Sequence, residues 1–318
     1  MKRLNVHPVL FIALYLIPTA SHATGLVALP ATGFVTSGGT SAYTLCNQTG
    51  NFGSVTHTPP TAGANNTCAV FPSNINTSPV SGFTLVSGTS LTRTITANGQ
   101  SLAFMDERVF RNAANTECIF AKRLRMNTVA AADFDYHPQR TGSQKLAVND
   151  IAFAGFNNST SLQAGYYLPP SVVEYSPIFR IGRTHTSVQM QANYFNPNTI
   201  ATGYLAQPLT SGAPAASTEI NGVGQTYPTP PGNPTAAQQT AAISANWVDF
   251  TLDISGGADE DGASASDSSV MYVRSTCSSA PPVALPNSVK IRQTGQETQP
   301  WVTISTIGFV PAGANTSF

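Results

Sequence analysis

Hydrophobic and polar residues alternate with a period of two along much of the chain, which is typical of β-strands rather than helices. The longest example begins at Leu91, where threonines occupy every second position. Asn98 and Gly99 follow, and a second strand-like run then extends to Phe110. Because Asn-Gly between two such runs favours a two-residue turn, the pattern predicts a β-hairpin.

The same alternation recurs further along. Between Cys118 and Met126, the even-numbered residues share one face of a strand, and the odd-numbered residues, which include Arg123 and Arg125, share the other. The other expected strands are Gly82–Ser87, Val148–Ala154, Ile178–Arg183, Ser187–Tyr194, Trp247–Ile254, Ser269–Thr276, Ser288–Gln293 and Trp301–Val310. No segment predicts a helix. Many short strands separated by Gly, Pro, Asn and Ser predict an all-β fold, specifically an antiparallel β-sandwich of the jelly-roll or immunoglobulin-like type.

Two stretches have low sequence complexity. Residues 55–81 are mostly Thr, Pro, Asn, Ser and Ala, and residues 206–244 contain few apolar side chains. A structureless loop this long is uncommon within a compact domain. Since the chain after it offers only about four strands, too few for an independent sandwich, we expect one elaborated domain over residues 24–318 rather than two.

The first 23 residues have the three parts of a secretory signal peptide. Lys2 and Arg3 are basic, an apolar run extends from Val9 to Ile17, and small residues precede a cleavage site after Ala23. The alternative, a transmembrane anchor, needs about 20 apolar residues. We therefore expect an exported protein in the periplasm, at the cell surface or outside a bacterial cell, without a transmembrane segment after cleavage.

Export changes the meaning of the four cysteines. An even number of cysteines in an oxidising compartment predicts two disulfides. Four cysteines allow three pairings, and the pairing that we expect joins Cys46 to Cys68 and Cys118 to Cys277.

Charge excludes one class of partner. Only 9% of the residues are charged, against about 25% in an ordinary soluble domain, and the formal net charge is zero. This composition gives no electrostatic footprint for nucleic acid.

The sharpest candidate for metal chemistry is Asp133, Asp135 and His137. In an extended chain these side chains point to one face, and two carboxylates with an imidazole suit a divalent metal. His185, on another expected strand, can complete the site. The alternative is a polar strand edge that ends in a turn at His137.

A second acidic cluster, which includes Asp259 and Asp261, lies among glycines in an expected loop. Oxygen ligands on such a loop can bind calcium, although the spacing does not fit the helix-loop-helix calcium pattern. The alternative is a solvated hairpin tip. No other cofactor is indicated.

Nucleophilic catalysis has little support, because Gly-x-Ser-x-Gly is absent. A carboxylate pair for glycoside hydrolysis has four candidate members: Asp106, Glu107, Asp150 and Glu174. The first two are neighbours in sequence and would face opposite sides of a strand.

Aromatic residues are candidates for ligand binding. Tyr166, Tyr167 and Tyr194 occur near segments rich in Pro and Asn, where exposed rings can stack on sugars; the alternative is that the rings fill the core.

The leading expectation is a non-catalytic exported protein that is a surface or structural component or binds a ligand such as a glycan. Its partners would be a polysaccharide or further copies joined through strand edges. The alternatives are a periplasmic divalent-metal-binding protein and an extracellular hydrolase with an unrecognised site.

Overall fold

The described part of the chain is built from strands. The structure is a computed structural model that describes residues 25–36, 39–46, 59–63, 67–97, 99–129, 145–157, 159, 161–169, 175–184, 243–257, 265–294 and 301–315. These residues form seventeen strands and no helix, which confirms the all-β class. Within these ranges, no helical segment has the length and apolarity that crossing a membrane would need.

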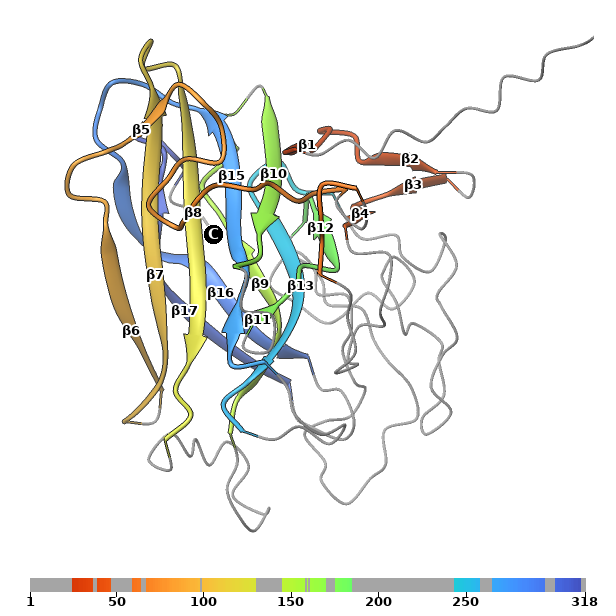
Figure 1. The fold of residues 1–318 in the computed structure, drawn as a ribbon, viewed down its shortest axis with the longest axis vertical. Coiled ribbons are helices and arrows are strands. Elements are labelled where there is room, and N and C mark those ends of the chain that lie inside the picture. The colour runs from red at the N-terminus through yellow and green to blue at the C-terminus, as the bar shows by residue number, and fades with distance from the viewer. Residues whose placement is uncertain are drawn as a thin grey trace, which may run out of the picture.

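Nine strands form the larger sheet. Its centre is an antiparallel run in the order β10, β15, β8 and β7, which lie side by side in Figure 1. These strands are β7 (Gln100–Asn112), β8 (Glu117–Met126), β10 (Leu162–Tyr167) and β15 (Val270–Thr276). Shorter strands extend this run: β1 (Val27–Ala28), β5 (Phe83–Leu85), β6 (Leu91–Ala97), β11 (Tyr175–Ser176) and β14 (Asp267–Ser268). Strands β5 and β6 share the edge of β7 that faces away from β8.

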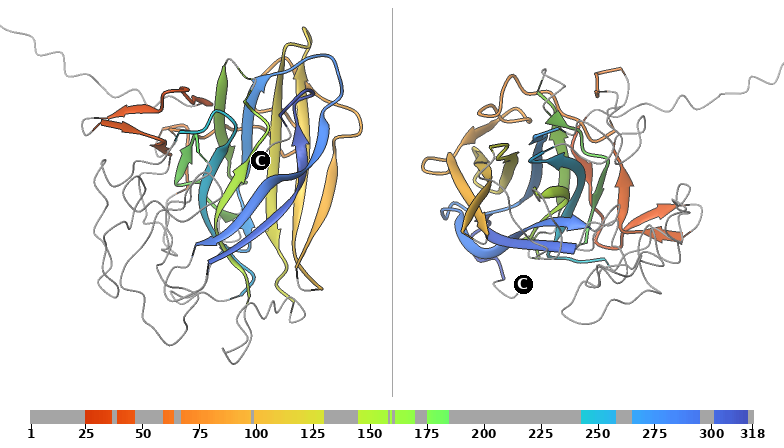
Figure 2. Two further views of the ribbon diagram at one scale, coloured as in Figure 1. Left: turned by 180° about the vertical axis from the view of Figure 1, so that it is seen from behind. Right: turned by 90° about the horizontal axis from the view of Figure 1, so that it is seen from below.

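Six strands form the second sheet, in the order β17, β16, β9, β13, β12 and β4, and all of its pairings are antiparallel. Their bounds are Tyr43–Leu45 for β4, Ala147–Phe153 for β9, Arg180–Gly182 for β12, Val248–Ser255 for β13, Val283–Thr294 for β16 and Trp301–Val310 for β17. A ribbon of β2 (Phe34–Thr36) and β3 (Gly39–Ser41) projects to one side in Figure 1. Figure 2 shows the curl of the larger sheet from below.

A single buried cluster receives side chains from both large sheets. Phe120 and Leu124 come from the nine-stranded sheet, and Phe153 and Phe250 come from the six-stranded sheet. The rings of Phe120 and Phe156 meet edge to face, with centroids 5.7 Å apart. Since full burial of such a side chain contributes about 1.5–3 kcal/mol, this cluster is a principal source of stability.

The predicted hairpin is present. Strands β6 and β7 pair antiparallel, and Gly99 in the turn between them has a φ of 76°, a conformation that glycine adopts readily. The alternation in β8 also holds, because Phe120 and Leu124 belong to the inter-sheet cluster while Ile119 and Ala121 pack on the opposite face.

A separate cluster covers part of the outer face of the nine-stranded sheet. Phe110, Ile119 and Tyr272 on the sheet contact Val70 and Phe83 from the segment that precedes β6. The described part of the low-complexity stretch 55–81 therefore packs against a sheet.

Strand β10 corrects the sequence interpretation of Tyr166 and Tyr167, which did not include a strand there. Both residues end this strand, which pairs with β1 and β15. The strand signal was weak because Gly165 interrupts it. A Cβ atom on Gly165 would lie 2.6 Å from the carbonyl oxygen of Cys68, so glycine permits the close approach of β10 and the segment that contains Cys68.

Two disulfides join the pairs that the sequence predicted. Cys46 follows β4 of the smaller sheet, and its partner Cys68 accepts a hydrogen bond from the Tyr166 amide in the larger sheet. This bond therefore links the two sheets. The other disulfide joins Cys118 in β8 to Cys277, directly after β15.

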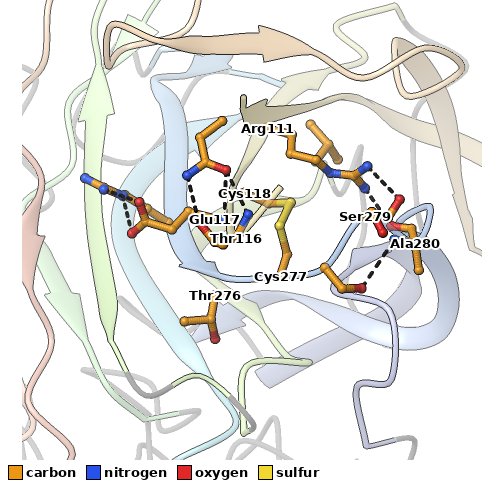
Figure 3. Close-up of a disulfide and its surroundings, with 12 residues drawn as sticks. Arg111, Thr116, Glu117, Cys118, Thr276, Cys277, Ser279 and Ala280 are labelled. Carbon is orange, nitrogen blue, oxygen red and sulfur yellow. Dashed lines mark hydrogen bonds and ion pairs between the residues drawn. A yellow bond between two sulfur atoms is a disulfide. The ribbon is translucent and has the colours of Figure 1, made fainter. Parts of the chain in front are cut away.

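Figure 3 shows how polar contacts surround the Cys118–Cys277 disulfide. On one side Arg111 donates to the carbonyl oxygens of Ser279 and Ala280, at 2.9 and 2.6 Å. On the other side Glu117 is bound by Arg274, with the shorter contact at 2.6 Å. Several long-range contacts therefore converge on this end of the sheet.

Several expectations fall outside the described residues. They are the signal peptide at 1–23, the strand at 187–194 and almost all of the segment at 206–244.

We predict that the two disulfides stabilise the fold unequally. They close loops of 22 and 159 residues, for which the chain-entropy model gives about 3 and about 5 kcal/mol. Replacing both cysteines of one pair with alanine, followed by urea unfolding, measures each contribution. The Cys118→Ala/Cys277→Ala variant should lose more stability; equal losses, or the reverse order, would contradict the prediction.

Candidate functional site

Apart from the Arg274–Glu117 pair beside the disulfide, the ion-paired side chains of the described residues form three groups. We name these the acidic trio (Asp150, Asp249 and Arg292), the Phe309 clamp (Glu107, Lys122 and Arg93) and the arginine shelf (Asp106, Arg123 and Arg125). Each group joins strands that are adjacent in the fold.

The acidic trio lies on the face of the six-stranded sheet that points away from the inter-sheet cluster. Asp150 on β9 is directly opposite Arg292 on β16, and Asp249 on β13 is diagonal to Asp150. Arg292 Nη1 donates to Asp150 Oδ1 at 2.6 Å and lies 3.4 Å from Asp249 Oδ2. All three side chains are buried, with at most 2% of their surface exposed.

Burial makes the trio an unusual electrostatic site. Burial, and then the neighbouring Asp150, raise the pKa of Asp249 well above its ordinary value, while Arg292 opposes this shift only in part. Three buried oxygens here have no hydrogen-bond partner in the described part of the structure: Asp150 Oδ2, Asp249 Oδ1 and Thr251 Oγ1. Thr251 is directly opposite Asp150 in the ladder.

The Phe309 clamp joins the two sheets through charged side chains in the interior. Glu107 Oε1 accepts a hydrogen bond from the backbone amide of Phe309 at 2.8 Å, and Lys122 Nζ donates to the carbonyl oxygen of Phe309 at 3.1 Å. Glu107 and Lys122 are 3.2 Å apart, and Arg93 also binds Glu107. Two side chains of the larger sheet thus bind the backbone of β17 in the smaller sheet.

The neighbouring Gly308 is needed for this approach. A Cβ atom there would lie 2.6 Å from Val289 Cγ2 and 3.0 Å from Lys122 Cε. Burial lowers the pKa of Lys122, although Glu107 acts in the opposite direction.

The arginine shelf lies on the outer face of the nine-stranded sheet. Asp106 accepts hydrogen bonds from Thr92 Oγ1 at 2.7 Å, from Arg123 Nη2 at 2.7 Å and from Arg125 Nε at 2.9 Å. Burial alone would raise the pKa of Asp106, but these hydrogen bonds outweigh it and lower the pKa to about 2. The carboxylate is therefore ionised at any physiological pH and fixes both guanidinium groups in place.

Each guanidinium group of the shelf also lies over an aromatic ring. The Cζ atom of Arg125 is 5.5 Å from the ring centre of Phe104, and that of Arg123 is 6.0 Å from the ring centre of Tyr175. The side chains of Arg125 and Arg123 remain 34% and 18% exposed, respectively. Arg125 makes this group more open to solvent than the trio or the clamp, in which Arg93 is the most exposed side chain at 18%.

The candidate metal ligands cannot be placed. Asp133, Asp135, His137, His185, Asp259 and Asp261 all lie outside the described residues. Within the part that the structure describes, no three His, Cys, Asp or Glu side chains are grouped as a metal site would require.

The candidate ligand-binding aromatics lie apart from one another. Tyr166 is fully buried in the inter-sheet cluster, and Tyr167 is buried in the cluster on the opposite face of β10. Their rings therefore form no shared exposed platform, and Tyr194 lies outside the described residues.

Three of the four candidate hydrolytic carboxylates are described and lie apart from one another, and Glu174 lies outside the described residues. Asp106 and Glu107 do face opposite sides of β7, since one belongs to the shelf and the other to the interior clamp. Asp150 shares the guanidinium group of Arg292 with Asp249, a residue that the sequence pattern did not single out. The available signal was the alternation of the predicted strand Trp247–Ile254, which places Asp249 on the same face as Thr251 and Asp253.

Comparison of the chain with protein-family models, with curated proteins and with solved structures gave no match.

We predict that the Phe309 clamp acts as a unit. Lys122→Met removes the donor to the Phe309 carbonyl oxygen and should cost about 3–5 kcal/mol, because it leaves buried polar groups without their partner. Urea unfolding of this variant, of Glu107→Gln and of the double variant completes a double-mutant cycle. The double variant should lose clearly less stability than the sum of the single losses; additive losses would show that the two side chains act independently.

Proposed function

We propose that the protein is an exported, non-catalytic surface or structural component that assembles with further copies through the edge of its six-stranded sheet. The observation that carries this proposal is the character of β17. This ten-residue strand pairs with β16 on one side, and no strand among the described residues pairs with its other side.

The composition of β17 is unusual for an edge. It contains no charged residue and no proline, and six of its ten residues are Val, Ile or Thr, at positions 302, 303, 304, 306, 307 and 310. Native proteins normally protect an edge strand with charges, proline or a bulge, because its unpaired backbone groups recruit other strands. By contrast, edge strand β6 carries the inward-pointing charge of Arg93, which is one of these protective devices.

The orientation of the β17 backbone follows from the clamp. The amide and the carbonyl of Phe309 bind Glu107 and Lys122, so they point away from β16. Since backbone groups alternate along a strand, the amides of Ile307 and Ser305 point to the same side. Beyond the clamp, these groups are positioned to pair with a strand of another molecule.

Two further features support the rest of the proposal. The two disulfides agree with an oxidising compartment, and the first 23 residues have the pattern of a signal peptide. In the three charged groups, the carboxylates bind arginine or lysine side chains of the same chain, which suits structural roles better than proton transfer.

For the architecture, we propose an elaborated antiparallel sandwich of the jelly-roll or immunoglobulin-like type. The inter-sheet cluster supports it, as does the path of the chain, since β8, β9, β10 and β12 alternate between the two large sheets.

We predict that blocking the β17 edge abolishes assembly. Ser305→Pro removes one outward-facing amide and no bond to β16, a position at which an edge strand tolerates proline. Light scattering after size-exclusion chromatography, over a range of concentrations, should show oligomers for the natural protein and monomers for the variant.

Ser305→Thr is the matched control, because it keeps the amide and should assemble as the natural protein does. Thermal unfolding of both variants checks that the fold survives. A natural protein that stays monomeric at every concentration would overturn the proposal, as would a folded Ser305→Pro variant that still assembles.

A second candidate function is polysaccharide binding at the arginine shelf. Fixed guanidinium groups beside Phe104, Tyr175 and the Thr92 hydroxyl form a polar surface flanked by aromatic rings, and Arg125 is the most exposed of the paired charges. Sugars are bound by hydrogen bonds from such groups combined with contacts to rings.

We predict that Arg125→Gln weakens retention on a polysaccharide by about tenfold, since it removes a charged donor worth about 1.5 kcal/mol or more. Affinity electrophoresis in gels that contain neutral or acidic polysaccharides measures this. Arg274→Gln, which makes the same change opposite Ile119 near the start of β8, should change nothing, since Arg125 lies at the other end of this strand. Migration unaffected by every polysaccharide would remove this candidate.

A further inference from the structure

The acidic trio contains buried carboxylate oxygens that have no hydrogen-bond donor among the described residues. One guanidinium nitrogen, Arg292 Nη1, serves one oxygen of Asp150 and approaches one oxygen of Asp249. The other oxygen of each carboxylate is buried and has no donor within the described structure. The two carboxylates bind the same cation from adjacent strands, and Asp150 acts on Asp249 both by its charge and as a side-chain hydrogen-bond partner.

The charges of the trio, like its hydrogen bonds, do not balance. Two ionised carboxylates and one guanidinium group would leave one uncompensated negative charge in a site where both aspartates are fully buried. An unpaired buried charge is so costly that the group normally takes up a proton instead. One proton makes the trio neutral and supplies the missing donor between the two orphaned oxygens.

Among the described residues, no second cation binds the carboxylates and neutralises the remaining negative charge. Lys290 shares this face of β16, but its Nζ atom lies over the ring of Trp247 at 5.1 Å from the centroid. On β12, Arg180 lies on the same face, opposite Thr251. Tyr43 on β4 packs over Gly182, which is opposite Asp249. In the part of the chain that the structure describes, the cations facing this site are therefore Arg292, Lys290 and Arg180, and of these Arg292 is the one with ion pairs to the two carboxylates.

We propose that Asp150 and Asp249 share a single proton, and that the neutral trio is a pH-sensitive lock across β9, β13 and β16. While the proton is bound, the trio holds these three strands together. Loss of the proton in alkaline solution leaves two buried carboxylates against one arginine and loosens the central strands of the sheet. This inference does not depend on the proposed assembly through β17.

The direction of the pH effect follows from linkage. Folding raises the pKa of Asp249 above its unfolded value, so the folded state binds the proton more tightly. The stabilisation is complete below about pH 4, the unfolded value, and is lost as pH rises through the raised value in the folded state.

The test compares the natural protein with Asp249→Asn, whose amide imitates a carboxyl group that keeps its proton. Urea unfolding is measured at pH values from 4 to 10. The ratio of the unfolding constants, natural protein over variant, should rise with pH by up to about tenfold per unit and then level off. In carbon-13 NMR of aspartate carboxyl groups, one signal should titrate well above pH 4 in the natural protein and be absent from the variant.

Two other variants make the result interpretable. Asp253→Asn makes the same chemical change on the same strand outside the trio, and should show no such rise. Asp150→Asn should reproduce the effect of Asp249→Asn, because either carboxylate can be the one that stays charged, and it serves as the test variant if Asp249→Asn does not fold.

Two outcomes would overturn the proposal. The first is a ratio that is independent of pH, together with aspartate signals that all titrate near or below pH 4. The second is stabilisation of the natural protein, but not of Asp249→Asn, by millimolar calcium at neutral pH, because the paired oxygens would then hold a cation rather than a proton.

Discussion

The hydrogen bonds from Glu107 and Lys122 to the backbone of Phe309 are the constraint on which the packing of the two sheets depends. Hydrophobic burial is not directional and would allow the sheets to slide over each other. Two buried charges that must bind one amide and one carbonyl allow only one position. The same contact sets which backbone groups of β17 face outward, and Gly308 provides the space that it needs.

The outer faces of the two sheets differ in how they hold charged side chains. On the nine-stranded sheet, one part is covered by an apolar segment that includes Val70, and another part carries the partly exposed arginine shelf. On the six-stranded sheet, the face opposite the core holds fully buried charges at Asp150 and Asp249. At these places the first sheet presents charged groups to solvent, whereas the second sheet buries them.

Local patterns predicted what depends on local chemistry. Asn98 and Gly99 located a hairpin, alternation located β8, and an even cysteine count after an expected signal peptide led to both disulfides. Patterns could not predict which charges meet, because Asp150 and Arg292 are 142 residues apart and pair only through strand register. Nor could they identify β10. There, Gly165 is required by the close approach of the Cys68 backbone, and it weakens the strand signal that would have located Tyr166.

The order of the cysteines has a consequence for how the chain matures. In a chain that enters an oxidising compartment from its N-terminus, Cys46 and Cys68 emerge first, and they are partners only 22 residues apart. Once they are joined, Cys118 has no competing thiol and waits for Cys277, which emerges 159 residues later. In such a chain, the order of delivery by itself would favour the observed pairing over the two other possible pairings.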